Sequence, residues 1–170
     1  MGQVLRIAGF IPESIVDGPG IRAVIFLQGC LRHCPGCHNP QTWDMDGGTE
    51  TDASGIMDAI ASDPLVHSVT FSGGEPFLQA RELIPIAEEL KARGYEVASY
   101  TGFCFEELLN GTDATRGLLG CLDVLIDGPY IEAERSLELH FRGSRNQRVL
   151  DVLESLKAGR AVLVEDERWT

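Results

Sequence analysis

The stretch Cys30-Leu31-Arg32-His33-Cys34-Pro35-Gly36-Cys37 places three cysteines within eight residues, with a Pro-Gly corner before the last of them. This spacing lets one short loop hold three sulfur atoms around one inorganic centre. Metal charge lowers the pKa of a bound thiol, so that the metal-binding thiolate forms. One such centre is an iron–sulfur cluster in which one iron has no protein ligand, an open position like that of catalytic zinc sites. The other is a zinc site that takes His33 or His38 as its fourth ligand.

A short apolar run, Arg22–Leu27, precedes this cysteine loop and has the β-branched content of a buried parallel strand. The loop therefore follows the carboxyl end of a strand, where α/β folds place their chemistry. Further strands are predicted at Val66–Phe71, Tyr95–Tyr100 and Leu122–Ile126. Each is followed by a polar segment that contains glycine, so we expect these segments to meet at one edge of the sheet.

Helical patterns alternate with these strands, and the clearest is Gln79–Arg93, which Gly94 ends and Pro85 disturbs. A second helix opens at Thr51 or Asp52. A first strand is expected at Val4–Phe10, and Phe105–Leu109 is expected to begin a further helix. Two late strands around a loop are expected at Gln147–Val152 and Ala161–Val164. This alternation predicts an α/β fold, a partial, open (β/α) barrel with mainly parallel strands. It has too few units for a closed barrel of about 250 residues.

The length predicts one domain over residues 1–170, with its core at about 11–151 and an irregular extension with one short helix after about 130. The chain has 26 acidic and 14 basic residues, a net charge of −12, which argues against a nucleic-acid partner. No apolar run approaches the ~20 residues that span a bilayer, and no signal peptide is visible, so we expect a cytoplasmic protein without a membrane partner. Cys104 and Cys121 stand alone and are expected to be small buried residues.

The cysteine loop followed by Ser72-Gly73-Gly74-Glu75-Pro76 resembles the radical S-adenosylmethionine superfamily. Five further segments narrow the resemblance to the activating proteins of anaerobic, glycyl-radical ribonucleotide reductases: Asp17-Gly18-Pro19-Gly20-Ile21-Arg22, Cys34-Pro35-Gly36-Cys37-His38-Asn39, Tyr100-Thr101-Gly102, Ile126-Asp127-Gly128 and Phe141-Arg142-Gly143-Ser144-Arg145-Asn146-Gln147. The resemblance runs from about Ile11 to Asp151. It implies a 4Fe–4S cluster on the loop cysteines Cys30, Cys34 and Cys37, with S-adenosylmethionine on the fourth iron.

The resemblance also assigns candidate ligand contacts. It implies that Ser72, Gly73, Gly74 and Glu75 hold the methionine amino group, and that Gly36, Cys37 and His38 lie beside the adenine. Many superfamily members have an aromatic residue where this chain has Gly36. Thr101 and Asp127 end neighbouring strands, where they could bind the ribose or position the methionyl group and a cation. They could equally be helix caps or turn formers.

Other residues have weaker assignments. Asp17, Gly18 and Gly20 lie where related activators approach the substrate glycine. The Arg142–Gln147 part of the last motif has no role that its chemistry reveals. We expect Arg22, Arg142 and Arg145 to be solvated surface charges, and Trp43 and Trp169 to be packing or surface residues.

The resemblance implies a mechanism without a general acid or base. An external one-electron reductant, such as flavodoxin or ferredoxin, reduces the cluster, and S-adenosylmethionine is then cleaved. The resulting 5′-deoxyadenosyl radical takes a hydrogen atom from a glycine of the large reductase subunit. The alternatives are an activase of another glycyl-radical enzyme of the pyruvate formate-lyase type, a radical enzyme acting on a small molecule, and a non-catalytic zinc or electron-transfer module.

Overall fold

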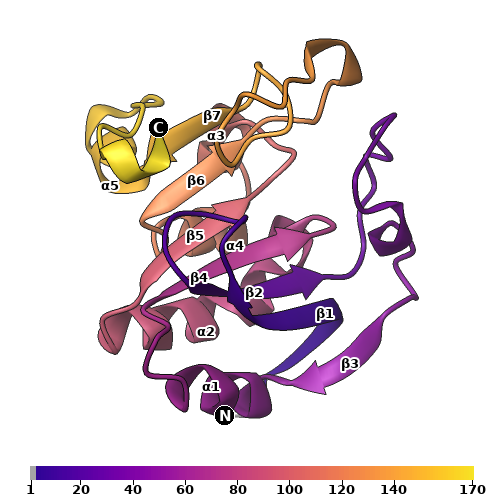
Figure 1. Cartoon of the computed structure of the whole chain (residues 1–170), viewed down its shortest axis with the longest axis vertical. Coiled ribbons are helices and arrows are strands. Elements are labelled where there is room, and N and C mark those ends of the chain that lie inside the picture. Colours follow the sequence, from indigo (N-terminus) through magenta and orange to yellow (C-terminus); the bar gives the residue numbers. More distant parts are fainter. Residues whose placement is uncertain (1–2) are drawn as a thin grey trace.

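Seven strands form one sheet in the computed structural model, which describes residues 3–170, so that residues 1 and 2 of the predicted domain lie outside the description (Figure 1). The strands are β1 (Val4–Ser14), β2 (Arg22–Leu27), β3 (Thr49–Asp52), β4 (Ser68–Gly73), β5 (Glu96–Tyr100), β6 (Val124–Asp127) and β7 (Arg148–Asp151). The helices are α1 (Ala53–Ala61), α2 (Ala80–Ala92), α3 (Phe105–Leu109), α4 (Asp113–Leu119) and α5 (Val152–Ala158). Short 3-10 helices are η1 (Pro40–Thr42), η2 (Pro76–Gln79), η3 (Glu132–Glu134) and η4 (Glu167–Trp169).

The strand order is β3-β1-β2-β4-β5-β6-β7, and the sheet is mixed. The central strands β2, β4, β5 and β6 pair in parallel, as predicted. The outer pairings of β1 with β2, β1 with β3, and β6 with β7 are antiparallel. The connection between β1 and β2 is too short for a parallel crossover, which needs a dozen or more residues. The α/β class is thus confirmed, whereas the strands are parallel only in the centre of the sheet.

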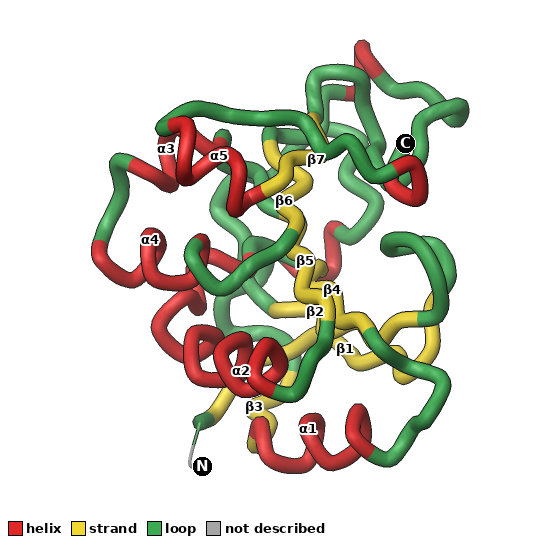
Figure 2. The backbone as a smooth tube through the Cα atoms, turned by 90° about the vertical axis from the view of Figure 1, so that its left-hand side faces the viewer, coloured by secondary structure: helices red, strands yellow, loops and turns green. Residues whose placement is uncertain are grey.

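Both faces of the sheet are covered. Figure 2 shows α2, α3 and α4 on one side and long loops on the other. The helical side contains the main core, in which Leu83, Ile86 and Leu90 of α2 pack with Phe71 and other apolar strand residues. The opposite side has a smaller core, in which Ala98, Ile126 and Val149 pack against Trp169 from the C-terminal turn. The C-terminal segment therefore covers one end of the face that the helices leave free.

Several sequence predictions need correction. Ala161–Val164 forms no strand and makes only an isolated bridge between Leu163 and Leu150. The segment after β7 is the helix α5, where a loop was expected, although its end signals are present: Asp151 caps its first turn and Gly159 ends it in the left-handed conformation. The polar strand β3 and the short helix α4 were not predicted. The excursion after Tyr130 is irregular with one short helix, as expected. Across residues 3–170, the structure contains no helix with the length and apolar character needed to span a bilayer.

Candidate active site

A cavity of about 410 Å³ lies at the carboxyl ends of the parallel strands. Its walls come from the cysteine loop, the Ser72–Glu75 segment, the Tyr100–Gly102 segment and Gly128 after β6. The prediction that these segments meet at one sheet edge is therefore correct. The volume lies within the range of about 300–1,000 Å³ that is usual for small-molecule sites.

All three loop cysteines line this cavity. The base of their loop is fixed by backbone hydrogen bonds, from the amide of Gly29 to the carbonyl of Thr42 (2.6 Å) and from the amide of Cys30 to the carbonyl of Trp43 (3.2 Å). The amide of Asn39 donates to the sulfur of Cys37 (3.4 Å), which holds the end of the loop in place. The loop thus presents three sulfur donors to one cavity.

The two histidines considered as a fourth zinc ligand both pack against aromatic rings, and His38 also lines the cavity. The ring of His33 stacks on Trp43, with centroids 4.5 Å apart and planes inclined by 12°, and His38 packs against Tyr130 at 5.1 Å. Within residues 3–170, no three or more His, Cys, Asp or Glu side chains are grouped to hold a metal ion. A four-iron cluster holds its cysteine ligands farther apart than a single ion does. Three cysteine thiols are the donor set that a four-iron cluster with one open iron needs, and all three line the cavity.

The Cys30 thiol lies in a setting that favours its protonated form. Burial raises its pKa, and the carboxylate of Glu75 adds to the increase, while backbone hydrogen bonds from Arg32 and His33 oppose it. Positive charge from bound iron would have the opposite effect and would make the thiolate the stable form.

Glu75 is a buried carboxylate in the wall of the cavity. Its Oε2 accepts hydrogen bonds from the amide of Phe77 (3.0 Å) and the hydroxyl of Thr101 (2.9 Å), and its Oε1 accepts one from the amide of Gly102 (2.7 Å). Burial raises its pKa, and these hydrogen bonds counteract the increase. The carboxylate ties the end of β4 to the end of β5 and favours a cationic group on any ligand beside it.

The two glycines before Glu75 are needed because neighbouring backbone passes close to them. A Cβ on Gly73 would lie 2.5 Å from the backbone of Leu27, and a Cβ on Gly74 would lie 2.3 Å from the carbonyl oxygen of Gly29. Both glycines admit neighbouring protein backbone. The amides of Gly74 and Glu75 are also occupied, by the carbonyls of Leu27 and Gly29. This segment can thus offer a ligand carbonyl oxygens, which suit an ammonium group.

The side chains of Thr101 and Asp127 bond to other groups of the protein, in line with the expected alternative that they are turn or cap formers. Thr101 lines the cavity, but its hydroxyl donates to Glu75 and accepts from the amide of Phe103. Asp127 is fully buried and lies outside the cavity lining. Its carboxylate accepts from the amide of Phe105 (2.7 Å), at the start of α3, and from Arg148 (3.0 Å). The structure therefore does not bring the Asp127 carboxylate into the site.

Of the remaining predicted contact residues, some line the cavity and others lie outside it. Asp17 and His38 line the cavity, and Asp17 is held by the hydroxyl of Ser14 (2.8 Å). Gly18, Gly20 and Gly36 lie outside the lining. Gly18 has φ +143°, and a Cβ there would lie 2.6 Å from the guanidinium carbon of Arg22, so both the backbone conformation and the space favour glycine. Gly36 has φ +76° and faces the carboxylate of Glu132.

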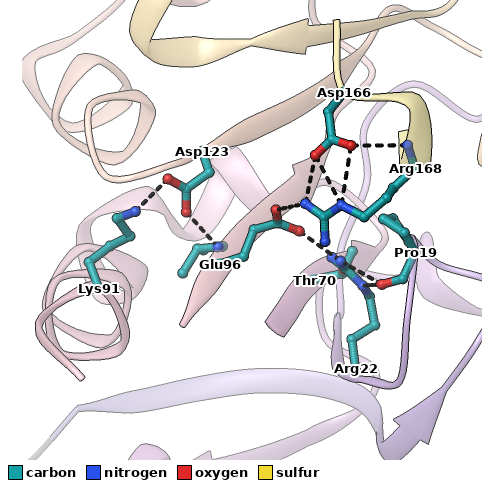
Figure 3. Close-up of polar contacts among 9 residues, drawn as sticks. Pro19, Arg22, Thr70, Lys91, Glu96, Asp123, Asp166 and Arg168 are labelled. Carbon is teal, nitrogen blue, oxygen red and sulfur yellow. Dashed lines mark hydrogen bonds and ion pairs between the residues drawn. The ribbon is translucent and has the colours of Figure 1, made fainter. Parts of the chain in front are cut away.

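Arg22 is fully buried, so the expectation of a solvated charge is wrong. Its guanidinium donates to Glu96 (2.8 Å), to the hydroxyl of Thr70 (3.1 Å) and to the carbonyl of Pro19, and Arg168 binds the same Glu96 (Figure 3). It also lies 5.0 Å from the ring centre of Trp169. The network holds the turn after Asp17 and the C-terminal turn against the sheet. The sequence did contain a signal for the burial of Arg22, because this arginine is the first residue of a continuous apolar run.

The far wall of the cavity consists of residues to which sequence reasoning gave no role: Tyr100, Leu139, Phe141, Arg142, Gly143 and Gln147. The hydroxyl of Tyr100 donates to the carbonyl of Phe141 (2.8 Å), which joins this wall to the end of β5. Burial, with the nearby charge of Asp17, raises the pKa of Tyr100 well above its usual value, so the phenol stays protonated. The last sequence motif is thus part of the same site as the cysteines.

Comparison with known proteins agrees with this arrangement. The family described as "4Fe-4S single cluster domain" matches residues 16–150. The pyruvate formate-lyase-activating enzyme of Clostridium pasteurianum is 41% identical over 117 residues, 64% of this chain and 49% of that protein. The corresponding enzyme of Listeria monocytogenes is 37% identical over 147 residues, 82% of this chain and 59% of that protein. The chain thus spans about half the length of the first of these relatives and 59% of the second.

A second kind of relative aligns over nearly its whole length. The anaerobic ribonucleoside-triphosphate reductase-activating protein of Salmonella typhi is 30% identical over 152 residues, 84% of this chain and 96% of that protein. The crystal structure of QueE from Escherichia coli is a more distant match, with a TM-score of 0.46 and 19% identity over 58% of this chain and 53% of that chain.

Proposed function

Since this chain belongs to the 4Fe-4S single cluster domain family, we propose that it is a radical S-adenosylmethionine activase of a glycyl-radical enzyme, namely of an anaerobic ribonucleoside-triphosphate reductase. The observation that carries the proposal is the composition of the cavity at the carboxyl ends of the parallel strands. Its walls contain the loop cysteines, the Ser72–Glu75 segment, Asp17 from one reductase-activator motif and Arg142 from the other.

Each part of the wall has a task in this proposal. The loop cysteines hold the cluster, and the carbonyls of the Ser72–Glu75 segment, with the Glu75 carboxylate, accept hydrogen bonds from the amino group of S-adenosylmethionine. His38 and Cys37 border the adenine. When bound, the cluster and S-adenosylmethionine supply the one-electron chemistry that removes a hydrogen atom from a peptide glycine, with an external protein such as flavodoxin or ferredoxin as the reductant.

The sheet ends at β3 on one side and at β7 on the other. We take it to be a partial barrel that stays open for a loop of the partner enzyme. Val16, which lines the cavity, is 72% exposed, so an apolar side chain stands at the entrance. A peptide loop is a more suitable occupant of an open site than a small metabolite, because small-molecule sites bury most of their ligand.

The reductase is preferred as partner for two reasons. The alignment with the Salmonella typhi protein runs over 96% of that protein, so this chain has counterparts of nearly all of it. The Asp17–Arg22 and Phe141–Gln147 segments also resemble the reductase activators, and neither is needed to hold the cluster. The competing candidate is a pyruvate formate-lyase, because identities of 41% and 37% to the corresponding activating enzymes are higher.

Parallel activation assays separate the two partners. The reconstituted protein, S-adenosylmethionine and dithionite are incubated anaerobically with either an anaerobic ribonucleotide reductase or a pyruvate formate-lyase from the same organism. The proposal predicts reduction of ribonucleoside triphosphates in the first mixture and no formate-lyase activity in the second. Activity in the second mixture alone would assign the competing function. Activity in neither, with no 5′-deoxyadenosine formed, would reject the activase.

A further inference from the structure

The loop Phe141–Gln147 is held rigidly at the cavity wall. The side-chain oxygen of Gln147 accepts from the amides of Gly143 (2.8 Å) and Ser144 (3.2 Å), and its nitrogen donates to the carbonyl of Gly128 (3.1 Å). The Asn146 side chain donates to the carbonyl of Pro129 (2.7 Å). These contacts fix the loop to the end of β6 and occupy two of its backbone amides.

Unpaired polar groups are concentrated at this wall. Across residues 3–170, the buried side-chain nitrogen and oxygen atoms without a hydrogen-bond partner are Arg142 Nε, Asn146 Oδ1 and Trp169 Nε1. Two of these belong to the loop, and the Trp169 indole packs edge-on against Phe141 at 5.4 Å. Buried polar groups are normally paired, so such a cluster needs an explanation.

Arg142 is the member of this set that reaches the cavity. Within the described part of the chain, its guanidinium makes one protein hydrogen bond, from Nη1 to the carbonyl of Gln147 (3.1 Å). The preceding residue, Phe141, has φ +61°, a conformation that non-glycine residues rarely adopt. Tyr100 stabilises it through the hydrogen bond to its carbonyl. Strain of this kind persists where the surrounding structure imposes it, often at functional sites.

We propose that Arg142 positions the substrate loop by donating hydrogen bonds to a backbone carbonyl oxygen of the glycine-bearing strand, an inference that rests on the proposed function. Glycine has no side chain, so the residue that loses its hydrogen atom can be recognised only through its backbone and its neighbours. A guanidinium has donors and no acceptor, and a peptide carbonyl is its matching partner. The carboxylate of S-adenosylmethionine could also accept hydrogen bonds from Arg142, and the experiment distinguishes this carboxylate from the peptide carbonyl.

Arg142→Met is compared with Arg142→Lys and with the matched control Arg145→Met, because Arg145 is exposed and lies outside the cavity lining. The probe is a fluorescent synthetic peptide that covers the radical glycine of the partner reductase. Its affinity for the cluster-loaded protein with S-adenosylmethionine, without reductant, is measured anaerobically by fluorescence anisotropy. We expect Arg142→Met to weaken peptide binding about ten- to a hundredfold, Arg142→Lys to weaken it less, and Arg145→Met to change it less than about twofold.

Thioamide substitution of single peptide carbonyls identifies the acceptor. One thioamide should weaken binding to the wild type and have no further effect in Arg142→Met. The affinity for S-adenosylmethionine, measured by equilibrium dialysis, should be the same in all proteins. Equal peptide affinity of Arg142→Met and Arg145→Met would overturn the inference, as would a loss confined to S-adenosylmethionine binding. If Arg142→Met fails to retain its cluster, Arg142→Lys carries the test. A wild type that binds no peptide would count against the proposed function itself.

Discussion

Replacing Gly74 by Ala tests how the end of β4 supports the cysteine loop. The added Cβ would lie 2.3 Å from the carbonyl oxygen of Gly29, 2.8 Å from its carbonyl carbon and 3.0 Å from the carbonyl oxygen of Thr42. All three atoms are backbone, so no side chain can move aside. Ordinary contact begins at 3.4 Å, so the Gly29 carbonyl must move by about 1 Å. That movement displaces the residue from which the cysteine loop begins.

The cost follows from two effects. Overpacking a tightly packed site costs about 1–3 kcal/mol. The displacement also weakens the hydrogen bonds from the amides of Gly74 and Glu75 to Leu27 and Gly29, each worth about 0.5–1.5 kcal/mol. A total loss of about 2–4 kcal/mol leaves a typical domain folded and lowers its melting temperature by about 4–16 °C. The cluster should be affected more than the fold, because the change lies at the base of its loop.

The assay combines anaerobic thermal unfolding with iron analysis after reconstitution. The matched control is Gly55→Ala within α1, where a Cβ meets nothing within 4 Å and alanine should stabilise the helix by about 0.5–1 kcal/mol. We expect Gly74→Ala to melt lower and to retain less iron, whereas Gly55→Ala keeps its iron. A Gly74→Ala protein with wild-type melting temperature and iron content would refute the reasoning.

Three further changes have definite expected outcomes. Alanine at any one loop cysteine should abolish iron retention, while alanine at the two other cysteines, which lie outside the cavity, should leave it unchanged; iron retained by a loop-cysteine variant would contradict the ligand assignment. Glu96→Gln removes the charge beside the fully buried Arg22 and should lower the free energy of unfolding in urea by up to about 3 kcal/mol. The control Glu89→Gln, in an exposed pair, should lower it by less than about 0.5 kcal/mol, and equal losses would show that burial of the pair does not matter. The hydrogen bond from Arg148 lowers the pKa of Glu106, so the pair stabilises the protein at neutral pH and loses this contribution as pH falls through the lowered pKa. Because Glu106 is half exposed, Glu106→Gln should cost less than about 1 kcal/mol at pH 7 and nothing below that pKa, as thermal melts would show; a cost that grew in acid would contradict the sign.

The parts of the fold that carry their own local pattern were predictable from sequence. The strand Arg22–Leu27 has the bounds that were expected, and α3 begins at Phe105 as expected. The strand β3 consists of Thr49-Glu50-Thr51-Asp52 and lies at the sheet edge beside β1. It has no apolar residue to mark it, because its stability comes from pairing with a strand more than 40 positions earlier. Local sequence cannot reveal such a strand.

The candidate site shows the same division. The cysteines and the segments after each strand could be placed at one edge from their order alone. The direction of the Asp127 carboxylate could not be predicted, because it depends on the hydrogen bond from Arg148 of the neighbouring strand β7. The burial of Arg22 depends on Glu96, 74 positions away. The last motif was visible as a resemblance, but only the folded chain shows that it forms the far wall of the cavity.

The most direct test of the central claim is electron paramagnetic resonance of the reconstituted protein mixed anaerobically with the large reductase subunit, S-adenosylmethionine and dithionite. The account predicts a glycyl doublet on the reductase that disappears when its radical glycine is replaced by alanine or when any loop cysteine of this protein is replaced by alanine. Persistence of the doublet with a loop-cysteine variant, or cleavage of S-adenosylmethionine without a glycyl signal on the reductase, would contradict it.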